Sequence, residues 1–161
     1  MAAALAFLQD SGITDYAELA ARAGQAAARF HDLADRMKAV EGRLHDNAEL
    51  KRATVDYAKT RPVFDAYKAS RYSRRFLAGH EAELAAYRAA RATMNDILAG
   101  AKLPRMDKLK EDGRKLLAEK KELYADYRAA RQEMREALAV KANIDYLLGV
   151  SDPGREKEQE R

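Results

Sequence analysis

The sequence predicts an all-α protein: an elongated, antiparallel, coiled-coil-like helical hairpin with a small helical cap and a disordered C-terminal tail. Charged residues make up 35% of its 161 residues and aromatic residues only 7%, a bias typical of long helices. Glycine occurs 8 times and proline 3 times, which leaves few places for the chain to turn. Apolar residues also recur at alternating steps of three and four, the spacing of a helical seam. We expect one helical domain over residues 1–150.

The N-terminal segment is expected to form a short helix over residues 2–9, which breaks at residues 10–12. Its apolar start lacks a basic region, so we interpret it as helical turns rather than as a secretion signal. Thr14 has the position of an N-cap, because acidic residues follow it in the first turn of the next helix. Gly24 is a candidate interruption of that helix.

A long helix over about residues 25–60 carries the clearest seam. Its apolar positions are Phe30, Leu33, Met37, Val40 and Leu44. Asn47 takes the next seam position, and we expect a stutter near residues 47–51. The stripe then continues in a shifted register through Ala48, Val55 and Ala58. Pro62 leaves two alternatives: Thr60 caps a new helix with Pro62 in its first turn, or Pro62 kinks a continuous one.

The helical cap is expected over about residues 63–100. It opens with the apolar residues Val63, Phe64 and Tyr67, and a turn follows at residues 70–73. Ser73 is the predicted N-cap of a helix that begins at Arg74, and Gly79 is expected to split that helix. The next helix, about 80–99, has a stripe of Leu84, Tyr87, Met94 and Leu98. Arg91 falls on the same stripe, so Ala90 is the alternative inward residue, and Gly100 ends the helix.

The last and longest helix is expected over about residues 107–148, after a hinge at residues 102–106. Its seven-residue repeat consists of Leu109, Leu116, Leu123, Ala130, Ala137 and Ile144. The complementary apolar positions are Tyr127, Met134 and Leu148, whereas Gly113, Lys120 and Lys141 interrupt them. Gly149 ends the helix, and the charged residues 151–161 are the predicted disordered tail.

The two long helices, 25–60 and 107–148, are predicted to pack antiparallel within one chain. The same stripes also allow pairing between chains, so a homo-oligomer is the alternative arrangement.

The sequence argues against an active site of its own. There is no cysteine, which excludes disulfides and thiolate metal sites and suits a cytoplasmic protein. No apolar run approaches the length of a membrane span, so we expect no membrane insertion. His31, His45 and His80 are too far apart to share a metal, and we expect no cofactor and no catalytic residue. Tyr87, Tyr124 and Tyr127 are interpreted as packing residues rather than nucleophiles.

Basic residues gather at the two predicted turns, in a chain with a net charge of +4. The first cluster surrounds Ser73, and the second lies at the hinge, with Arg114 and Lys115 just after it. Such patches bind phosphates, and an aromatic ring among them stacks on a base. The alternative is that these cations only solvate the helix faces. The candidate nucleic-acid contacts are Arg71, Tyr72, Arg74, Arg75, Lys102, Arg105, Lys108 and Lys110.

The chain also resembles a known family in ten short segments. They are residues 7–13 (FLQDSGI), 16–19 (YAEL), 57–68 (YAKTRPVFDAYK), 72–76 (YSRRF), 79–81 (GHE), 102–104 (KLP), 117–124 (LAEKKELY), 127–128 (YR), 140–145 (VKANID) and 147–149 (LLG). In order and spacing they resemble the C-terminal helical region of relaxases, the mobilisation nucleases of integrative conjugative elements in Gram-positive, Clostridia-like bacteria. Pro62 departs from the pattern, which has an acidic residue there.

The resemblance implies a role in DNA transfer. Relaxases nick one DNA strand with a tyrosine and use a divalent metal held by histidines, but those residues belong to an N-terminal nuclease domain that this chain does not match. The chain is therefore expected to be an accessory module without nuclease activity, either a truncated piece or a detached C-terminal region. Its expected partners are DNA, the relaxase nuclease domain, and mobilisation or secretion proteins. The alternative function is a structural, oligomerising coiled coil.

Overall fold

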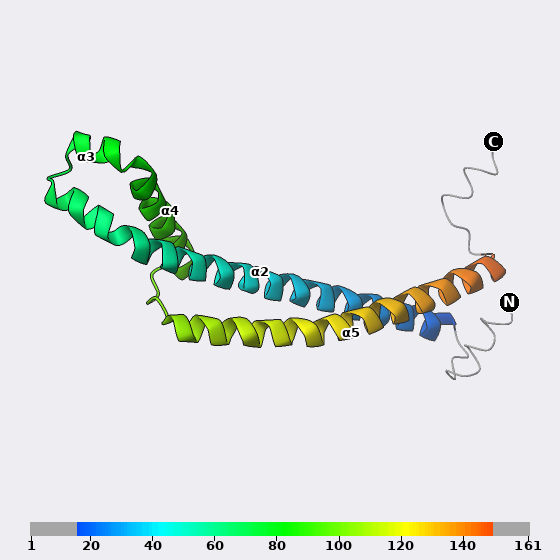
Figure 1. Ribbon diagram of the computed structural model, residues 1–161. Coiled ribbons are helices and arrows are strands. Elements are labelled where there is room, and N and C mark those ends of the chain that lie inside the picture. The colour runs from blue at the N-terminus through cyan, green and yellow to red at the C-terminus, as the bar shows by residue number, and fades with distance from the viewer. Residues whose placement is uncertain (1–15, 150–161) are drawn as a thin grey trace, which may run out of the picture. The chain divides into compact units, whose positions relative to one another are not determined.

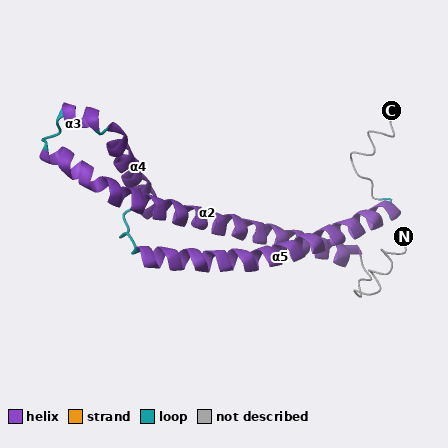
Figure 2. Ribbon diagram, in the orientation of Figure 1, coloured by secondary structure: helices purple, strands orange, loops and turns teal. Residues whose placement is uncertain are grey.

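The computed structural model describes residues 16–149, and 90% of it is helical with no strand in that range. The prediction of an all-α fold is therefore confirmed (Figures 1 and 2). The helices are α2 (Tyr16–Ala69), α3 (Arg74–Gly79), α4 (Glu81–Leu98) and α5 (Met106–Leu147). The predicted helix over 2–9, its break, the Thr14 cap and the tail over 151–161 lie outside the described residues.

Helix α2 is longer than predicted, because it continues through Gly24 at one end and through Pro62 at the other. Thr60 does not cap a new helix, since its hydroxyl donates to the carbonyl oxygen of Asp56 within the same helix at 2.7 Å. A proline inside a helix removes one hydrogen bond and costs about 3 kcal/mol. Packing beyond it offsets that cost: Phe64 stacks on Tyr87 with ring centroids 4.2 Å apart.

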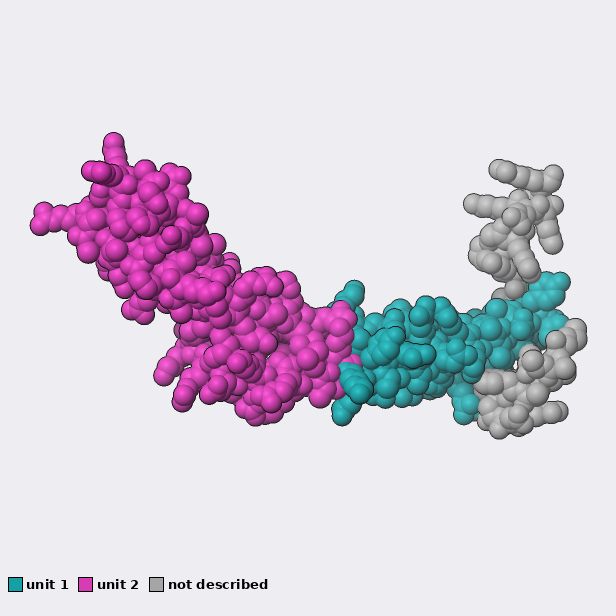
Figure 3. Space-filling model, in the orientation of Figure 1, with its two compact units in different colours: residues 1–38, 121–161 teal, residues 39–120 magenta. Residues whose placement is uncertain are grey.

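The chain divides by its internal contacts into two compact units. Unit 1 comprises residues 1–38 and 121–161, and unit 2 comprises residues 39–120 (Figure 3). Helices α2 and α5 contribute residues to both units, and α3 and α4 belong to unit 2.

Within unit 1 the two long helices are antiparallel, because residues late in α5 contact residues early in α2. The Tyr16 hydroxyl donates to the Asp145 carboxylate. The Arg29 guanidinium lies 3.3 Å from a Glu133 carboxylate oxygen. Between the helices, Ala23, Ala26 and Ala137 are buried with Met134 packed against them. Alanine at these positions lets the two backbones approach closely, so this core consists largely of small side chains.

Within unit 2 the same antiparallel direction holds between α2 and α5. The ion pairs Arg43–Glu119 and Lys120–Glu41 join them at 3.8 and 3.7 Å. Helix α4 provides a second neighbour for α2, because the Tyr87 ring stacks on Tyr57 as well as on Phe64. Figure 1 shows α3 and α4 folded back along the C-terminal part of α2, as the predicted helical cap requires.

The ends of the cap helices agree with their predicted signals. The Ser73 hydroxyl caps α3 by accepting from the Phe76 backbone N–H, and α3 ends at Gly79. On α4, Ala90 is buried beside Leu84 and Tyr87 while Arg91 is exposed, so the alternative inward residue is the correct one. Helix α4 ends at Leu98, followed by Ala99 and Gly100 at positive φ.

The seam positions are mostly where the sequence placed them. Leu33 and Val40 on α2 are buried. On α5 the seven-residue repeat is buried or half-buried throughout; its members are Leu109, Leu116, Leu123, Ala130, Ala137 and Ile144. Leu148 was wrongly predicted to be inward: it is 61% exposed, because α5 ends at Leu147, past the contact between Asp145 and Tyr16.

The shifted register after Asn47 was predicted in the wrong direction. Ala48, Val55 and Ala58 are exposed, and Leu50 and Ala53 are buried instead. Near Leu50, α2 has α4 as a neighbour in addition to α5, because Ile97 of α4 and Leu109 of α5 line the same pocket as Leu50. The buried face of α2 therefore rotates toward the new neighbour. A single helix pair, which is all that a heptad pattern describes, cannot reveal that rotation.

Candidate nucleic-acid interface

The turn between α2 and α3 has a backbone that usually requires glycine. The Tyr72 N–H donates to the Tyr67 carbonyl at 3.1 Å and the Arg71 N–H to the Lys68 carbonyl at 3.0 Å, the pair of bonds that defines a Schellman motif. Arg71 occupies its left-handed position, and both Arg71 and Tyr72 have φ of 58°. A non-glycine residue there costs about 1–2 kcal/mol. Strain of this kind gathers at functional sites, where the side chains rather than the backbone are needed.

Side chains behind the turn hold it in place. The Ser70 hydroxyl donates to the Tyr67 carbonyl at 2.6 Å and accepts from the Ser73 N–H at 3.3 Å. The Tyr67 ring contacts Tyr72 edge-on, with centroids 5.2 Å apart, and Phe76 at 5.9 Å. Because Tyr67 is buried, packing within unit 2 stabilises the turn in addition to the turn's own hydrogen bonds.

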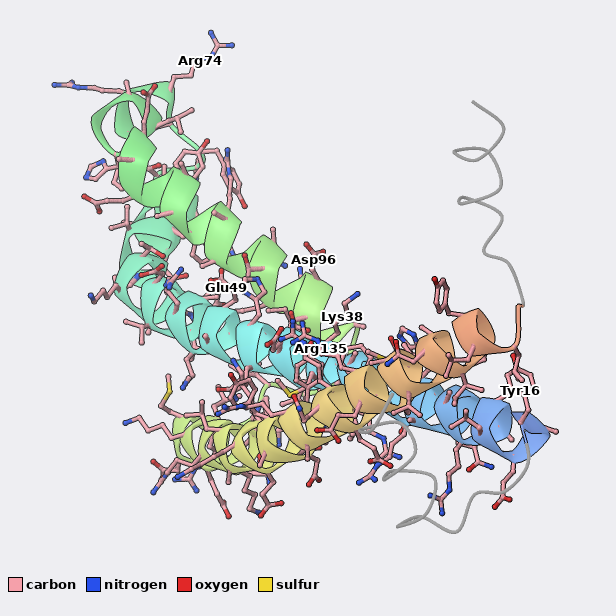
Figure 4. All side chains as sticks on the ribbon, turned by 90° about the vertical axis from the view of Figure 1, so that its right-hand side faces the viewer. Tyr16, Lys38, Glu49, Arg74, Asp96 and Arg135 are labelled. Atoms are coloured by element: carbon pink, nitrogen blue, oxygen red, sulfur yellow. The ribbon has the colours of Figure 1, made fainter. Side chains whose placement is uncertain are left out.

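The cations of this turn are open to solvent. Arg71, Arg74 and Arg75 are exposed, and no carboxylate within residues 16–149 forms an ion pair with them. Figure 4 shows Arg74 extending away from the helices. Tyr72 is 57% exposed, so part of its ring is open to a ligand. Lys68, in the last turn of α2, adds a cation to this basic turn that sequence reasoning missed. The sequence signal for Lys68 is its spacing, because it lies three residues before Arg71, about one helical turn away.

The four cations of the second predicted cluster have different surroundings. Lys102 and Arg105 are exposed in the connection between α4 and α5. Lys108 stays charged but is paired with an acid: its ammonium lies 3.0 Å from an Asp112 carboxylate oxygen, and this hydrogen bond raises the pKa of Lys108. Lys110 lies instead beside a groove between α2 and α5, together with Lys51 and Arg114.

The histidines are placed as packing or surface residues. His31 contacts the Phe30 ring, His80 stacks on Phe76 with centroids 4.1 Å apart, and His45 is exposed. Across residues 16–149 no three His, Cys, Asp or Glu side chains are grouped so that they could hold a metal ion.

Two of the three tyrosines interpreted as packing residues are packed. Burial raises the pKa of Tyr87, whose ring lies between Tyr57 and Phe64. Tyr127 packs on Phe30 with centroids 5.1 Å apart. Tyr124 is the exception, because it is half-exposed and its ring faces the Arg128 guanidinium at 5.9 Å.

A hydrogen-bonded cluster with shifted pKa values lies in unit 1. The hydrogen bond from Tyr16 lowers the pKa of Asp145, and the same bond raises the pKa of Tyr16. The Lys141 ammonium, 2.9 Å from the second Asp145 oxygen, adds to the effect on Asp145. The three side chains join the described start of α2 to the end of α5, so they stabilise the contact between these helix ends.

Acid is expected to weaken this contact. A carboxyl whose pKa is lowered by folding stabilises the folded state above its unfolded pKa, near pH 4, and that contribution is lost as pH falls through the lower, folded pKa. Tyr16→Phe removes the donor, so the pKa of Asp145 is expected to rise toward its ordinary value. An NMR titration of the Asp145 carboxyl checks this, with Tyr124→Phe as the control. An unchanged Asp145 pKa in Tyr16→Phe would show that the Tyr16 bond does not govern it.

No helix within residues 16–149 combines the length and the apolar character that a membrane crossing requires. Comparisons with protein-family models, with curated proteins and with solved structures give no significant match to this chain. The resemblance to relaxases therefore stays a prediction.

Proposed function

We propose that this chain is an accessory helical module of a DNA-mobilisation protein, and that it contacts DNA through the basic turn between α2 and α3. The observation that carries the proposal is the set of three exposed arginines, Arg71, Arg74 and Arg75, next in sequence to the exposed Tyr72. The turn places Arg71 on a strained backbone where glycine would cost less, which supports a use for its side chain.

The chemistry of the turn fits a nucleic-acid strand. Guanidinium groups bind phosphates and release the counterions condensed on DNA, which gives affinity without sequence readout. Tyr72 adds a ring on which an unpaired base can stack, and such a contact is worth about 1–3 kcal/mol. The proposal therefore favours single-stranded or distorted DNA over a regular duplex.

The resemblance to relaxases supplies the biological setting of the proposal. In that setting the nicking tyrosine and the metal belong to a separate nuclease domain, and this chain assists it in the cytoplasm by holding DNA. We assign no catalytic residue to the chain itself.

The alternative, an oligomerising coiled coil, has less support. In each unit most heptad residues of α2 and α5 are buried or half-buried within the single chain, for example Val40 in unit 2 and Ala130 in unit 1. A seam that is already occupied within the chain does not require a second copy.

Removing the three guanidiniums is expected to weaken DNA binding. In a titration with single-stranded DNA over a salt series, Arg71/Arg74/Arg75→Ala should bind less tightly at low salt. The slope of log K against log salt should also shrink by about 0.7 for each phosphate that the variant no longer neutralises. The matched control is Arg22/Arg131/Arg135→Ala, which removes three exposed arginines elsewhere on α2 and α5. Equal losses in the two triple variants would contradict the proposal, because they would reflect net charge alone.

A single substitution separates binding from folding at the same turn. Arg71→Gly relieves the left-handed strain, so the free energy of unfolding is expected to rise by about 1 kcal/mol. DNA affinity should fall in the same protein, because a phosphate-binding group is gone. A variant that is more stable and binds DNA as well as the parent would show that Arg71 does not contact DNA.

A further inference from the structure

An open groove of about 450 Å³ lies between α2 and α5 in unit 2. Its lining is mainly apolar and includes Leu44 and Ala48, with Leu117 at the edge. Three cations border it: Lys51 from α2, and Lys110 and Arg114 from α5. These residues are far apart in sequence, so the folding of α5 against α2 creates this combination.

The absence of a side chain at Gly113 leaves room for side chains of α2 to reach α5 beside the groove. A Cβ atom at Gly113 would lie 2.8 Å from the Asn47 Oδ1 and 3.4 Å from the Lys51 Nζ. The Lys51 ammonium therefore extends across the helix pair toward α5, to the side where Lys110 and Arg114 lie.

The charge of the three cations is not compensated by nearby acids. Within residues 16–149 no carboxylate forms an ion pair with Lys51, Lys110 or Arg114. Arg114 donates from its Nε to the Lys110 carbonyl at a long 3.5 Å. By contrast, Lys108 and Lys115 nearby are paired with Asp112 and Glu111. The groove thus concentrates positive charge on a surface where neighbouring cations of α5 are paired with acids.

Apolar side chains in and near the groove are also exposed. Leu117 is 59% exposed at its edge. On α2, Ala48 lines the groove and Val55, two helical turns further on, is 43% exposed. These α2 residues belong to the stripe that the heptad pattern marked as a seam and that neither α4 nor α5 covers.

We propose that this groove binds an amphipathic helix of a partner protein, with an apolar stripe flanked by acidic residues. An apolar stripe would cover Leu44, Ala48 and Leu117, and glutamate or aspartate side chains would pair with the three cations. The DNA backbone matches less well, because it offers nothing to the apolar lining. A second copy of this chain matches less well too, since two-fold pairing sets identical patches together and brings like charges close. This site is separate from the basic turn between α2 and α3.

A designed peptide tests the proposal on the full chain. The probe is a helix of about three heptads with leucine at the a and d positions and glutamate at the e and g positions. Repulsion between glutamates keeps this peptide from pairing with itself. A second peptide, with lysine in place of glutamate, controls for apolar contact alone. We expect calorimetry to show binding of the glutamate peptide and at least tenfold weaker binding of the lysine peptide.

Charge reversal in the groove is the decisive variant. Lys51/Lys110/Arg114→Glu should reverse the preference, so that the lysine peptide binds more tightly than the glutamate peptide. Arg22/Arg131/Arg135→Glu, with the same change in net charge elsewhere, should keep the original preference. Leu117→Ala should weaken binding of the glutamate peptide several-fold, because it removes the apolar edge.

Several results would overturn the proposal. One is no binding of the glutamate peptide at millimolar concentration, and another is an equal response to the two charge-reversal triples. A loss of DNA binding in the groove triple with peptide binding unchanged would assign the groove to nucleic acid. A change of oligomeric state in that triple by sedimentation, with no effect on the peptide, would assign it to a second copy.

Discussion

Leu84→Ala is expected to lower the free energy of unfolding by about 2–5 kcal/mol. Leu84 is only 1% exposed, on the face of α4 that also carries Tyr87 and packs on α2. Removing its side chain loses the favourable transfer from water and leaves a cavity that the surrounding helices fill only in part. Few other residues of unit 2 are buried so completely, because most of the described helices have one face exposed to solvent.

Chemical denaturation followed by circular dichroism measures this change. Leu117→Ala is the matched control, since it removes the same atoms from a leucine that is 59% exposed, and its effect should stay within about 0.5 kcal/mol. Equal effects of the two substitutions would mean that α4 does not pack on α2 as described. Because α4 lies against the part of α2 that carries the basic turn, Leu84→Ala should also weaken DNA binding as it approaches unfolding.

The long helices could be predicted because two packed helices each carry apolar residues at a regular seven-residue spacing, which is visible in the sequence. The repeat from Leu109 to Ile144 needs only α2 as its partner, and it is buried or half-buried over its whole length. Ala48 and Val55 were placed wrongly because α2 acquires a second neighbour there. A local pattern records that apolar residues are present, but not how many helices share them.

Pro62 illustrates a second limit of local reasoning. Its cost in a helix is a property of the residue and is readable from sequence. The contacts that offset it come from Tyr87, a residue of a different helix. Whether a helix survives a proline therefore depends on the tertiary structure, and both sequence alternatives treated the chain as if it were isolated.

The two candidate sites differ in the same way. Arg71, Arg74 and Arg75 lie within five residues of sequence, so their proximity can be read from the sequence. The groove was not predicted, because Lys51 meets Lys110 and Arg114 only after folding. Its one available signal was a pair of interruptions, Asn47 in one seam and Gly113 in the other, since a small and a polar residue facing each other would complement one another.

Gly113→Leu is expected to destabilise unit 2 by about 3 kcal/mol, even though leucine is the better helix former. A Cβ at this position would lie 2.8 Å from the Asn47 Oδ1, closer than real contacts allow. Asn47 is buried, and its amide donates to the Leu109 carbonyl at 2.9 Å. Turning it away would break that bond and leave a buried amide without a partner, at a cost of about 1–3 kcal/mol. The helices must therefore separate or lose this bond.

Gly42→Leu is the control that isolates this contact, because Gly42 lies inside α2 with nothing within 4 Å of the place that a Cβ atom would occupy. It should stabilise the chain by about 0.5–1 kcal/mol, through helix propensity alone. In the Asn47→Ala background the larger side chain gains room and no buried amide is left unpaired, so Gly113→Leu should cost less there. A coupling energy of about 1 kcal/mol or more between the two positions is expected in chemical denaturation. Equal effects of Gly113→Leu and Gly42→Leu would refute the close approach of α2 and α5 at Asn47.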